Sequence, residues 1–241
     1  MTPAEKLAKR VKQAAGMEWA DATKLASMAH ARFETFAGVD EKDAAALDKL
    51  DPYDAIQVRL AAWQSRNFGV PTTTQLVCGI GEELAEFDAA EPDSAEEDDA
   101  VGDVLIYCAQ LCTAYRLSLR ELIGQLIGHM SRWSVPGDRA VGSSGLLCHV
   151  ALKGEQRIRG LDDRSLARVG IAAGVACLAD SMAATRKEGA ILNMYAVTAA
   201  QVLRRDWRAN PVDAAQVVEG ASEADADPAT RGPIGGSGGG A

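Results

Sequence analysis

Two groups of acidic residues, each at helical spacing within an apolar frame, constrain the fold of this chain most. Glu82, Glu83 and Glu86 occur in one group, and Asp99 and Asp103 form the other. Residues three or four apart share one face of a helix, so Glu83 should project with Glu86, and Asp99 with Asp103. Two such helices packed side by side would gather four carboxylates.

A cluster of this kind has two interpretations. Inside a bundle, like charges repel and are poorly solvated, so a cation must lie between them. Oxygen ligands alone indicate Mg²⁺, or Mn²⁺ in its place, and magnesium held by carboxylates usually keeps positions for water and substrate phosphates. The alternative is a solvated acidic face, which the acid-rich segment 91–99 resembles. The apolar run 104–106 directly after Asp103 favours the metal site.

The composition predicts helices packed on helices. Hydrophobic residues make up 47% of the 241 residues and aromatic residues only 5%, a balance that favours helices over sheets. The net charge of −9 argues against nucleic-acid binding, which needs a concentrated basic surface. The cysteines show no CxxC pairing, so we expect small buried hydrophobes without zinc or disulfides: Cys78, Cys108, Cys112, Cys148 and Cys177.

No segment resembles a leader or a membrane span. The first residues lack an apolar signal core, and the most apolar stretch, Val169 to Ala184, is interrupted by Asp180 and is too short to span a membrane. We therefore expect a cytoplasmic protein without membrane contact.

Helical periodicity and its breaks divide the chain into four parts. Residues 1–50 are an N-terminal extension of two or three amphipathic helices. Residues 51–136 hold both acidic helices, the second from near Glu96 to about Tyr115, and a further helix from Ser118 to about Trp133. Residues 137–211 resume the helical pattern. The tail, 212–241, has too few apolar residues to offset its ordering entropy, so we expect it to be flexible.

The second and third parts resemble each other, which suggests a tandem repeat. The segment Gly81 to Trp133 aligns with Gly142 to Trp207. The acids Glu82, Glu83, Glu86 and Asp103 then correspond to Gly142, Ser143, Leu146 and Ala173. The second half instead carries a polar and basic cluster that includes Lys153, Gln156, Arg157 and Arg159.

These motifs resemble the MazG-like, all-α nucleoside triphosphate pyrophosphohydrolases, relatives of the dimeric dUTPases. The family motif is ExxE, a spacer and ExxD; Glu83-x-x-Glu86 matches the first part and Asp103 the final position. The chain departs from the motif at Ala100, where the second-helix Glu would lie, and Asp99 is its candidate replacement. Further similar strings are Trp63-Gln64-x-Arg66-Asn67-Phe68 and Arg204-Arg205-Asp206-Trp207.

The resemblance, which covers roughly residues 53–211, implies an all-α bundle and hydrolysis of a nucleoside triphosphate to monophosphate and pyrophosphate. Family members form bundles from two subunits, so the tandem halves are expected to form an intramolecular pseudo-dimer, and two such chains can pair further as a homodimer. The implied metal ligands for Mg²⁺ are Glu83, Glu86, Asp99 and Asp103, and Glu82 is a base for the water, a residue behind the ligands or a solvated side chain.

The implied substrate contacts come from two places. From the second half, the side chains expected to reach the phosphates are those of Lys153, Gln156, Arg157 and Arg159. The alternative is that these residues are ordinary surface charges. Trp63, Asn67 and Phe68 flank the first acidic helix, and the two rings are candidates for stacking on the base, although aromatic residues at helical spacing more often belong to the core.

Two other functions stay open. One is hydrolysis of a different phosphorylated nucleotide, such as an alarmone. The other is a catalytically decayed helical interaction module, which Ala100 and the second half without acids favour and the intact Glu83, Glu86 and Asp103 oppose. A di-iron carboxylate bundle is disfavoured because the chain lacks a Glu-x-x-His motif.

Overall fold

The structure, a computed structural model, describes residues 1–123, 136–184 and 190–209, and all regular elements in these ranges are helices. The predicted all-α class is therefore confirmed. Residues Met1–Arg205 form one compact unit, and Asp206–Ala241 form a second. The predicted flexible tail, 212–241, lies outside the described residues.

The N-terminal extension begins with two helices that have clear end signals. In α1 (Pro3–Ala15), Thr2 caps the first turn in a capping box with Glu5, and Gly16 ends the helix in the left-handed conformation. Next come α2 (Trp19–Glu34), the short α3 (Ala44–Leu47) and α4 (Pro52–Asn67). The two or three amphipathic helices expected before residue 50 are thus confirmed.

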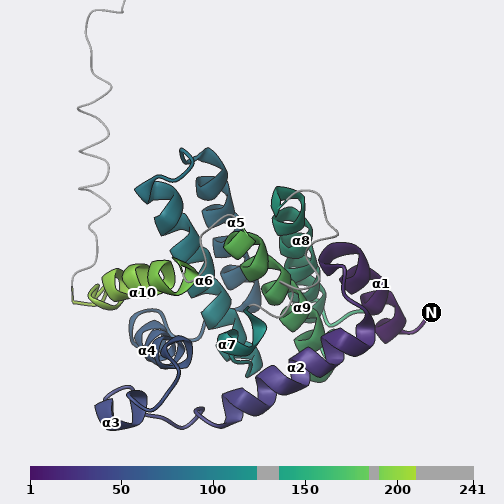
Figure 1. Cartoon of the computed structure of the whole chain (residues 1–241). Coiled ribbons are helices and arrows are strands. Elements are labelled where there is room, and N and C mark those ends of the chain that lie inside the picture. Colours follow the sequence, from purple (N-terminus) through teal and green to yellow (C-terminus); the bar gives the residue numbers. More distant parts are fainter. Residues whose placement is uncertain (124–135, 185–189, 210–241) are drawn as a thin grey trace, which may run out of the picture. The chain divides into compact units, whose positions relative to one another are not determined.

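Four helices form the centre of the larger unit: α5 (Thr73–Ala89), α6 (Ala95–Tyr115), α8 (Pro136–Glu155) and α9 (Arg164–Ala184). The pairs α5–α6 and α8–α9 each form a helical hairpin, and the hairpins meet through α5 against α8 and α6 against α9. Figure 1 shows these helices in blue-green to green, with α1 and α2 alongside.

Two further helices complete the unit. The short α7 (Leu119–Leu122) follows α6, and α10 (Ala190–Leu203) packs against both α4 and α6. The helix expected from Ser118 to about Trp133 ends at Leu122, because Ile123 has an extended backbone. The remainder of that predicted helix, with His129, lies outside the described residues.

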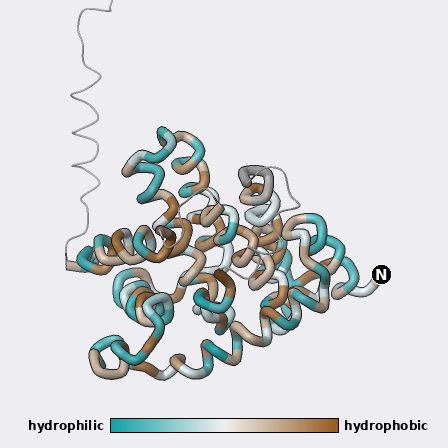
Figure 2. The backbone as a smooth tube through the Cα atoms, viewed as in Figure 1, coloured by the Kyte–Doolittle hydropathy of each residue, from teal (hydrophilic) through white to brown (hydrophobic). Residues whose placement is uncertain are grey.

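One hydrophobic core joins residues from all the described helices except α3, so α1 and α2 share a core with the bundle. A second, smaller cluster joins residues at the end of α2, in α3 and in α4: Phe33, Phe36, Leu47, Ala55 and Val58. Hydrophobic and hydrophilic segments alternate along the tube in Figure 2, as expected for helices with one buried face. At 21 residues, α9 is longer than the predicted apolar stretch and could cross a membrane by length and composition, but 83% of its apolar window is buried inside the protein. A helix buried in a protein core can also meet these criteria of length and composition.

The cysteine prediction is partly wrong. All five thiols are free, and Cys108, Cys112 and Cys177 are buried as expected. Cys78 and Cys148 are exposed. Cys78 helps to raise the pKa of the Cys148 thiol, so the two side chains lie near each other where α5 meets α8.

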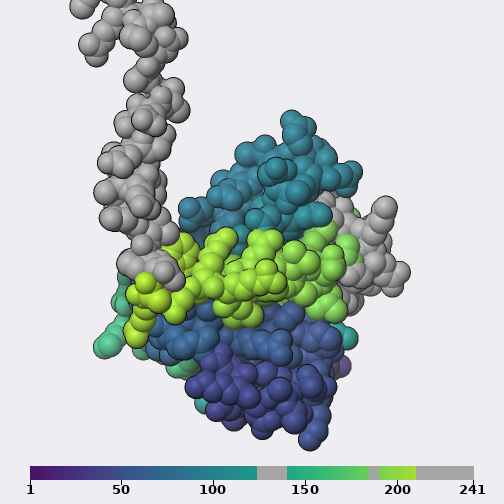
Figure 3. Space-filling model, turned by 90° about the vertical axis from the view of Figure 1, so that its left-hand side faces the viewer, coloured from purple at the N-terminus to yellow at the C-terminus, as the bar shows by residue number. Residues whose placement is uncertain are grey.

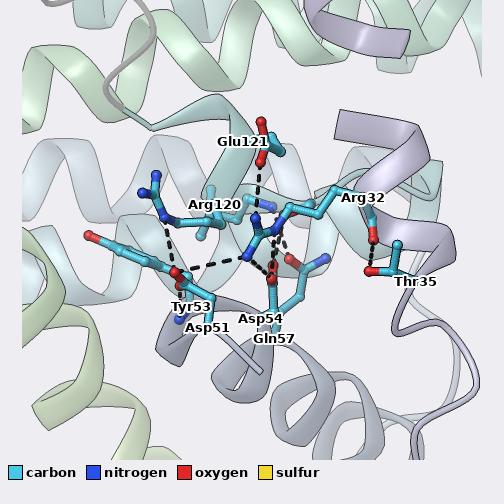
Figure 4. Close-up of polar contacts among 10 residues, drawn as sticks. Arg32, Thr35, Asp51, Tyr53, Asp54, Gln57, Arg120 and Glu121 are labelled. Atoms are coloured by element: carbon cyan, nitrogen blue, oxygen red, sulfur yellow. Dashed lines mark hydrogen bonds and ion pairs between the residues drawn. The ribbon is translucent and has the colours of Figure 1, made fainter. Parts of the chain in front are cut away.

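A buried polar network fixes α2 and α7 to α4 (Figure 4). Asp54, only 2% exposed, accepts hydrogen bonds from Arg32 Nε at 2.7 Å and Ser118 Oγ at 2.7 Å. Gln57 donates to the carbonyl of Leu117 at 2.8 Å and accepts from the backbone of Leu119 at 3.0 Å. Each buried polar group here has a partner, so the network stabilises the fold.

Candidate metal centre

The two acidic segments form the α5–α6 hairpin. Thr72 begins α5 through a capping box with Gln75, and Ser94 begins α6 by accepting from the backbone N–H of Glu97 at 3.1 Å. The acids Glu96, Glu97 and Asp98 stand in the first turn of α6, where the helix dipole favours negative charge.

A close approach of the two helices sets their register. A Cβ atom on Gly79 would lie 2.3 Å from the Tyr107 ring, so glycine leaves room for that ring against α5. Glu83 follows Gly79 by one turn, and Asp103 precedes Tyr107 by one turn. In an antiparallel hairpin, Glu83 and Asp103 are therefore level with each other. By the same register, Glu86 is level with the first part of α6, where Asp99 lies.

Glu83 and Asp103 are the half-buried members of the group, and the pKa of each carboxyl is raised. Burial, as the largest cause, and then the charges of Asp103, Glu86, Glu82 and Asp99 together raise the pKa of Glu83 to about 7. Burial also raises the pKa of Asp103 to about 6, with Asp99 as the strongest negative neighbour. The hairpin holds carboxylates together against their mutual repulsion.

Tyr107 closes the inner end of this group. Burial and the negative charges of Glu83, Glu82 and Asp103 raise the pKa of its hydroxyl. The phenol therefore stays protonated near neutral pH and can donate a hydrogen bond.

The third helix at the site, α10, crosses α6 beside the acids. A Cβ atom on Gly102 would lie 2.1 Å from Thr198 Oγ1, so glycine again permits the contact. The Thr198 hydroxyl donates to Asp99 Oδ1 at 3.2 Å. In Figure 3, α10 lies as a yellow-green band between the α5–α6 hairpin and α4.

Arg205, just past the end of α10, supplies positive charge. It follows Thr198 by seven residues, two helical turns, and is exposed. Its charge offsets part of the rise in the pKa of Asp103. Its backbone carbonyl accepts from the indole Nε1 of Trp63 at 2.8 Å. α4 therefore fixes the position from which the guanidinium extends.

The predicted aromatic contacts separate into two roles. Trp63 is 6% exposed and belongs to the core, and Asn67 donates from Nδ2 to its carbonyl at 3.0 Å. Phe68 is 58% exposed, and its ring meets that of Trp63 edge to face with the centroids 5.5 Å apart. Of these three side chains, Phe68 is the exposed one.

The predicted basic contacts lie elsewhere. Glu155, at the end of α8, accepts from the backbone N–H of Thr74 in the first turn of α5 at 3.1 Å. Glu83 is nine residues further along α5, about 14 Å at 1.5 Å per residue. The structure therefore does not bring the cluster of Lys153, Gln156, Arg157 and Arg159 together with the carboxylates.

The donor set fits a hard divalent cation in charge and in chemistry. It offers carboxylate oxygens only, and the half-buried acids repel one another. Within the described residues, no three acidic, histidine or cysteine side chains converge closely enough to hold a metal ion. To coordinate an ion, the Glu and Asp side chains must therefore change rotamer and turn toward a common centre. Their partial exposure leaves them room to do so.

Three residues at the site were not candidates from the sequence: Tyr107, Thr198 and Arg205. Arg205 stood in a string that resembles the family, but nothing in that string predicted a position near Asp103. The packing of α10 on α6 creates this proximity.

Comparisons of the chain with protein-family models, with curated proteins and with solved structures found no match.

Proposed function

We propose that the protein is a Mg²⁺-dependent nucleoside triphosphate pyrophosphohydrolase, with Mn²⁺ as an alternative ion. The observation that carries the proposal is the level pair Glu83 and Asp103, half-buried and surrounded by further acids, with the pKa of each raised by burial and like charge. Retaining such repulsion inside a fold is reasonable where a cation relieves it. The resemblance to the MazG-like family supplies the reaction.

Glu83, Glu86, Asp99 and Asp103 would hold the ion. A bound Mg²⁺ neutralises phosphate oxygens and makes a coordinated water more acidic. Thr198 orients Asp99 through its hydrogen bond, as outer-sphere partners do in metal sites. This hydrogen bond supports the assignment of Asp99 as the replacement for the family's second-helix Glu, which is Ala100 in this chain.

The remaining groups act on substrate and water. Glu82 is exposed on α5 next to Glu83 and can accept a proton from the attacking water. Tyr107 can donate to a carboxylate or a phosphate oxygen. Arg205 can bind phosphate oxygens by paired N–H donors. Phe68 offers its exposed ring to the base, and Trp63 holds the backbone that carries Arg205.

The tandem pseudo-dimer is part of the proposal. The hairpins α5–α6 and α8–α9 pack against each other through α5 with α8 and α6 with α9, which supports the proposal that they take the places of two subunits. The second hairpin would then complete the bundle without a metal site of its own. The sequence-based assignment of Lys153, Gln156, Arg157 and Arg159 to the metal-bound phosphates has no support in their positions. Cytoplasmic location and further pairing of chains follow from the sequence pattern and the resemblance alone.

The test is pyrophosphate release from a panel of canonical and modified nucleoside triphosphates with Mg²⁺ or Mn²⁺. Wild type is compared with Glu83→Gln and with Asp88→Asn, which removes an exposed carboxylate from the same helix. We expect turnover in the wild type and in Asp88→Asn but not in Glu83→Gln. Absence of turnover with folded, metal-supplied protein would overturn the proposal. An alarmone panel would then separate another nucleotide hydrolase from a helical interaction module.

A further inference from the structure

A second group of charged residues lies along the seam between α1 and α8. A Cβ atom on Gly142 would lie 3.3 Å from the Ala14 carbonyl, and one on Gly160 would lie 2.9 Å from Pro3. The two contacts show that α1 runs antiparallel to α8 and to the turn after it. Arg10, between Pro3 and Ala14, is therefore level with the second half of α8.

His149 on α8 reports which cations lie there. Burial, as the largest cause, and the positive charges of Arg10, Arg159 and Lys153 together lower the pKa of this imidazole to about 4. Three cations, from α1, α8 and the following turn, thus lie near one neutral histidine. Arg157 lies in the same turn, two residues before Arg159.

None of these cations takes part in an ion pair with another described residue. Lys153 donates to Gln156 Oε1 at 2.7 Å, a neutral partner. The nearby acids bind backbone groups instead: Glu155 accepts from Thr74, and Asp163 accepts from Ser165 at 2.8 Å. In a chain of net charge −9, these cations therefore lie together without an ion pair to a described residue, although Glu155, Asp162 and Asp163 are close in the sequence.

The backbone of the turn is also unusual. Arg157 and Arg159 have φ angles of 52° and 60°, in the left-handed region that favours glycine. The fold keeps both arginines there, which directs two guanidinium groups from one short turn. Guanidinium groups match phosphate oxygens by paired hydrogen bonds.

We propose that Arg10, Lys153, Arg157 and Arg159 form a diphosphate-binding site, separate from the carboxylates of α5 and α6, which takes inorganic pyrophosphate or the diphosphate group of a nucleotide. The site binds without a divalent metal, because its own cations neutralise the ligand. It joins the N-terminal extension to the bundle, which gives α1 a role beyond packing. The inference does not depend on the proposed catalytic function.

The test is a calorimetric titration of the full chain with inorganic pyrophosphate in the presence of EDTA, so that metal-dependent binding is removed. Arg10→Gln and Arg159→Gln are compared with Arg59→Gln, an exposed arginine on α4. We expect binding at least about tenfold weaker in each seam variant, because one charged hydrogen-bonding group is lost. Arg59→Gln and Glu83→Gln should bind like the wild type.

Two further readouts identify the ligand and its place. The ring resonances of His149, assigned with His149→Gln among only three histidines, should shift on titration. Tighter binding of ADP than of pyrophosphate would identify a nucleotide as the ligand, and equal or weaker binding would identify free pyrophosphate. No binding in EDTA, or equal weakening by Arg59→Gln, would overturn the proposal.

Discussion

The bundle contains two helical hairpins, α5–α6 and α8–α9, which differ in the residues that they enclose. In the α8–α9 hairpin, Ser143 and Ala173 are fully buried and Leu146 is 2% exposed, and a Cβ atom on Gly174 would meet the Leu147 side chain at 2.6 Å. The positions of α5–α6 that the proposed repeat aligns with these carry Glu83, Asp103 and Glu86, which are half-buried or exposed. One hairpin has a packed interior, and the other has an open acidic edge.

The difference shows that this packing does not require acids. Small and apolar residues fill the second hairpin at the positions where the first has carboxylates, so the carboxylates are not there for stability. Charges that weaken a fold are expected at sites where a ligand compensates for them. Moving an acid into the second hairpin, or removing one from the first, tests this difference directly.

The largest effect is expected from Ser143→Glu, which places an acid inside the packed hairpin. A buried carboxylate without a compensating cation should lower the free energy of unfolding by about 3–5 kcal/mol. Urea denaturation of the full chain measures this. Gly145→Glu on the same helix is the charge-matched control, because its Cβ would meet open space. Similar stability of the two variants would show that the second hairpin tolerates the acid as the first does.

The reciprocal change, Glu83→Gln, should affect activity and stability in opposite directions. Loss of a metal ligand should reduce pyrophosphate release by more than about 100-fold, since even outer-sphere partners of a metal cost 10–100-fold. Without metal at pH 8 the variant should melt above the wild type, because one repelling charge is gone. Asp88→Asn should change neither property, and lower stability of Glu83→Gln would contradict the account.

A smaller effect is expected from Arg205→Gln. Loss of one phosphate-binding cation should raise KM about tenfold, as for a charged hydrogen bond worth 1.5 kcal/mol or more. Steady-state kinetics measures it, and Arg208→Gln, in the second unit, is a nearby-sequence control. Unchanged kinetics would remove Arg205 from the substrate site.

The smallest effect is the pH dependence of the metal-free protein. The pKa of Glu83 is raised from 4.5 to about 7, and that of Asp103 from 3.8 to about 6. Between these values the folded state binds more protons than the unfolded state, so stability falls as pH rises from about 4 to about 7. Melting curves should show this fall, and the double variant Glu83→Gln, Asp103→Asn should lack it. A steeper fall in the double variant would mean that other groups dominate.

The sequence predicted the helices better than their meeting points. The start of α6 near Glu96 was predictable from the sequence because helical periodicity and its breaks are local signals. The proximity of Glu83 and Asp103 was also predictable, since a short connection makes neighbouring helices antiparallel. The position of Arg205 was not, because it depends on α10 crossing α6, about a hundred residues away in the chain.

The same limit explains the basic cluster. The sequence identified its residues as cations, and the repeat suggested that they complete the acidic site. Their place is set by Glu155 on the first turn of α5 and by α1 along α8, contacts between distant segments that no local pattern encodes. Likewise, Trp63 gave no sign that its indole would hold a backbone carbonyl 142 residues later.

The central claim, that a divalent cation relieves the repulsion between the carboxylates of α5 and α6, is tested most directly by melting the protein at pH 8 over a series of Mg²⁺ and Mn²⁺ concentrations. Binding to the folded state should stabilise the wild type, by about 2.7 kcal/mol at 100 times the Kd. The double variant Glu83→Gln, Asp103→Asn should melt at a temperature independent of either ion. A wild type that gains no stability, or a double variant that gains as much, would contradict the account.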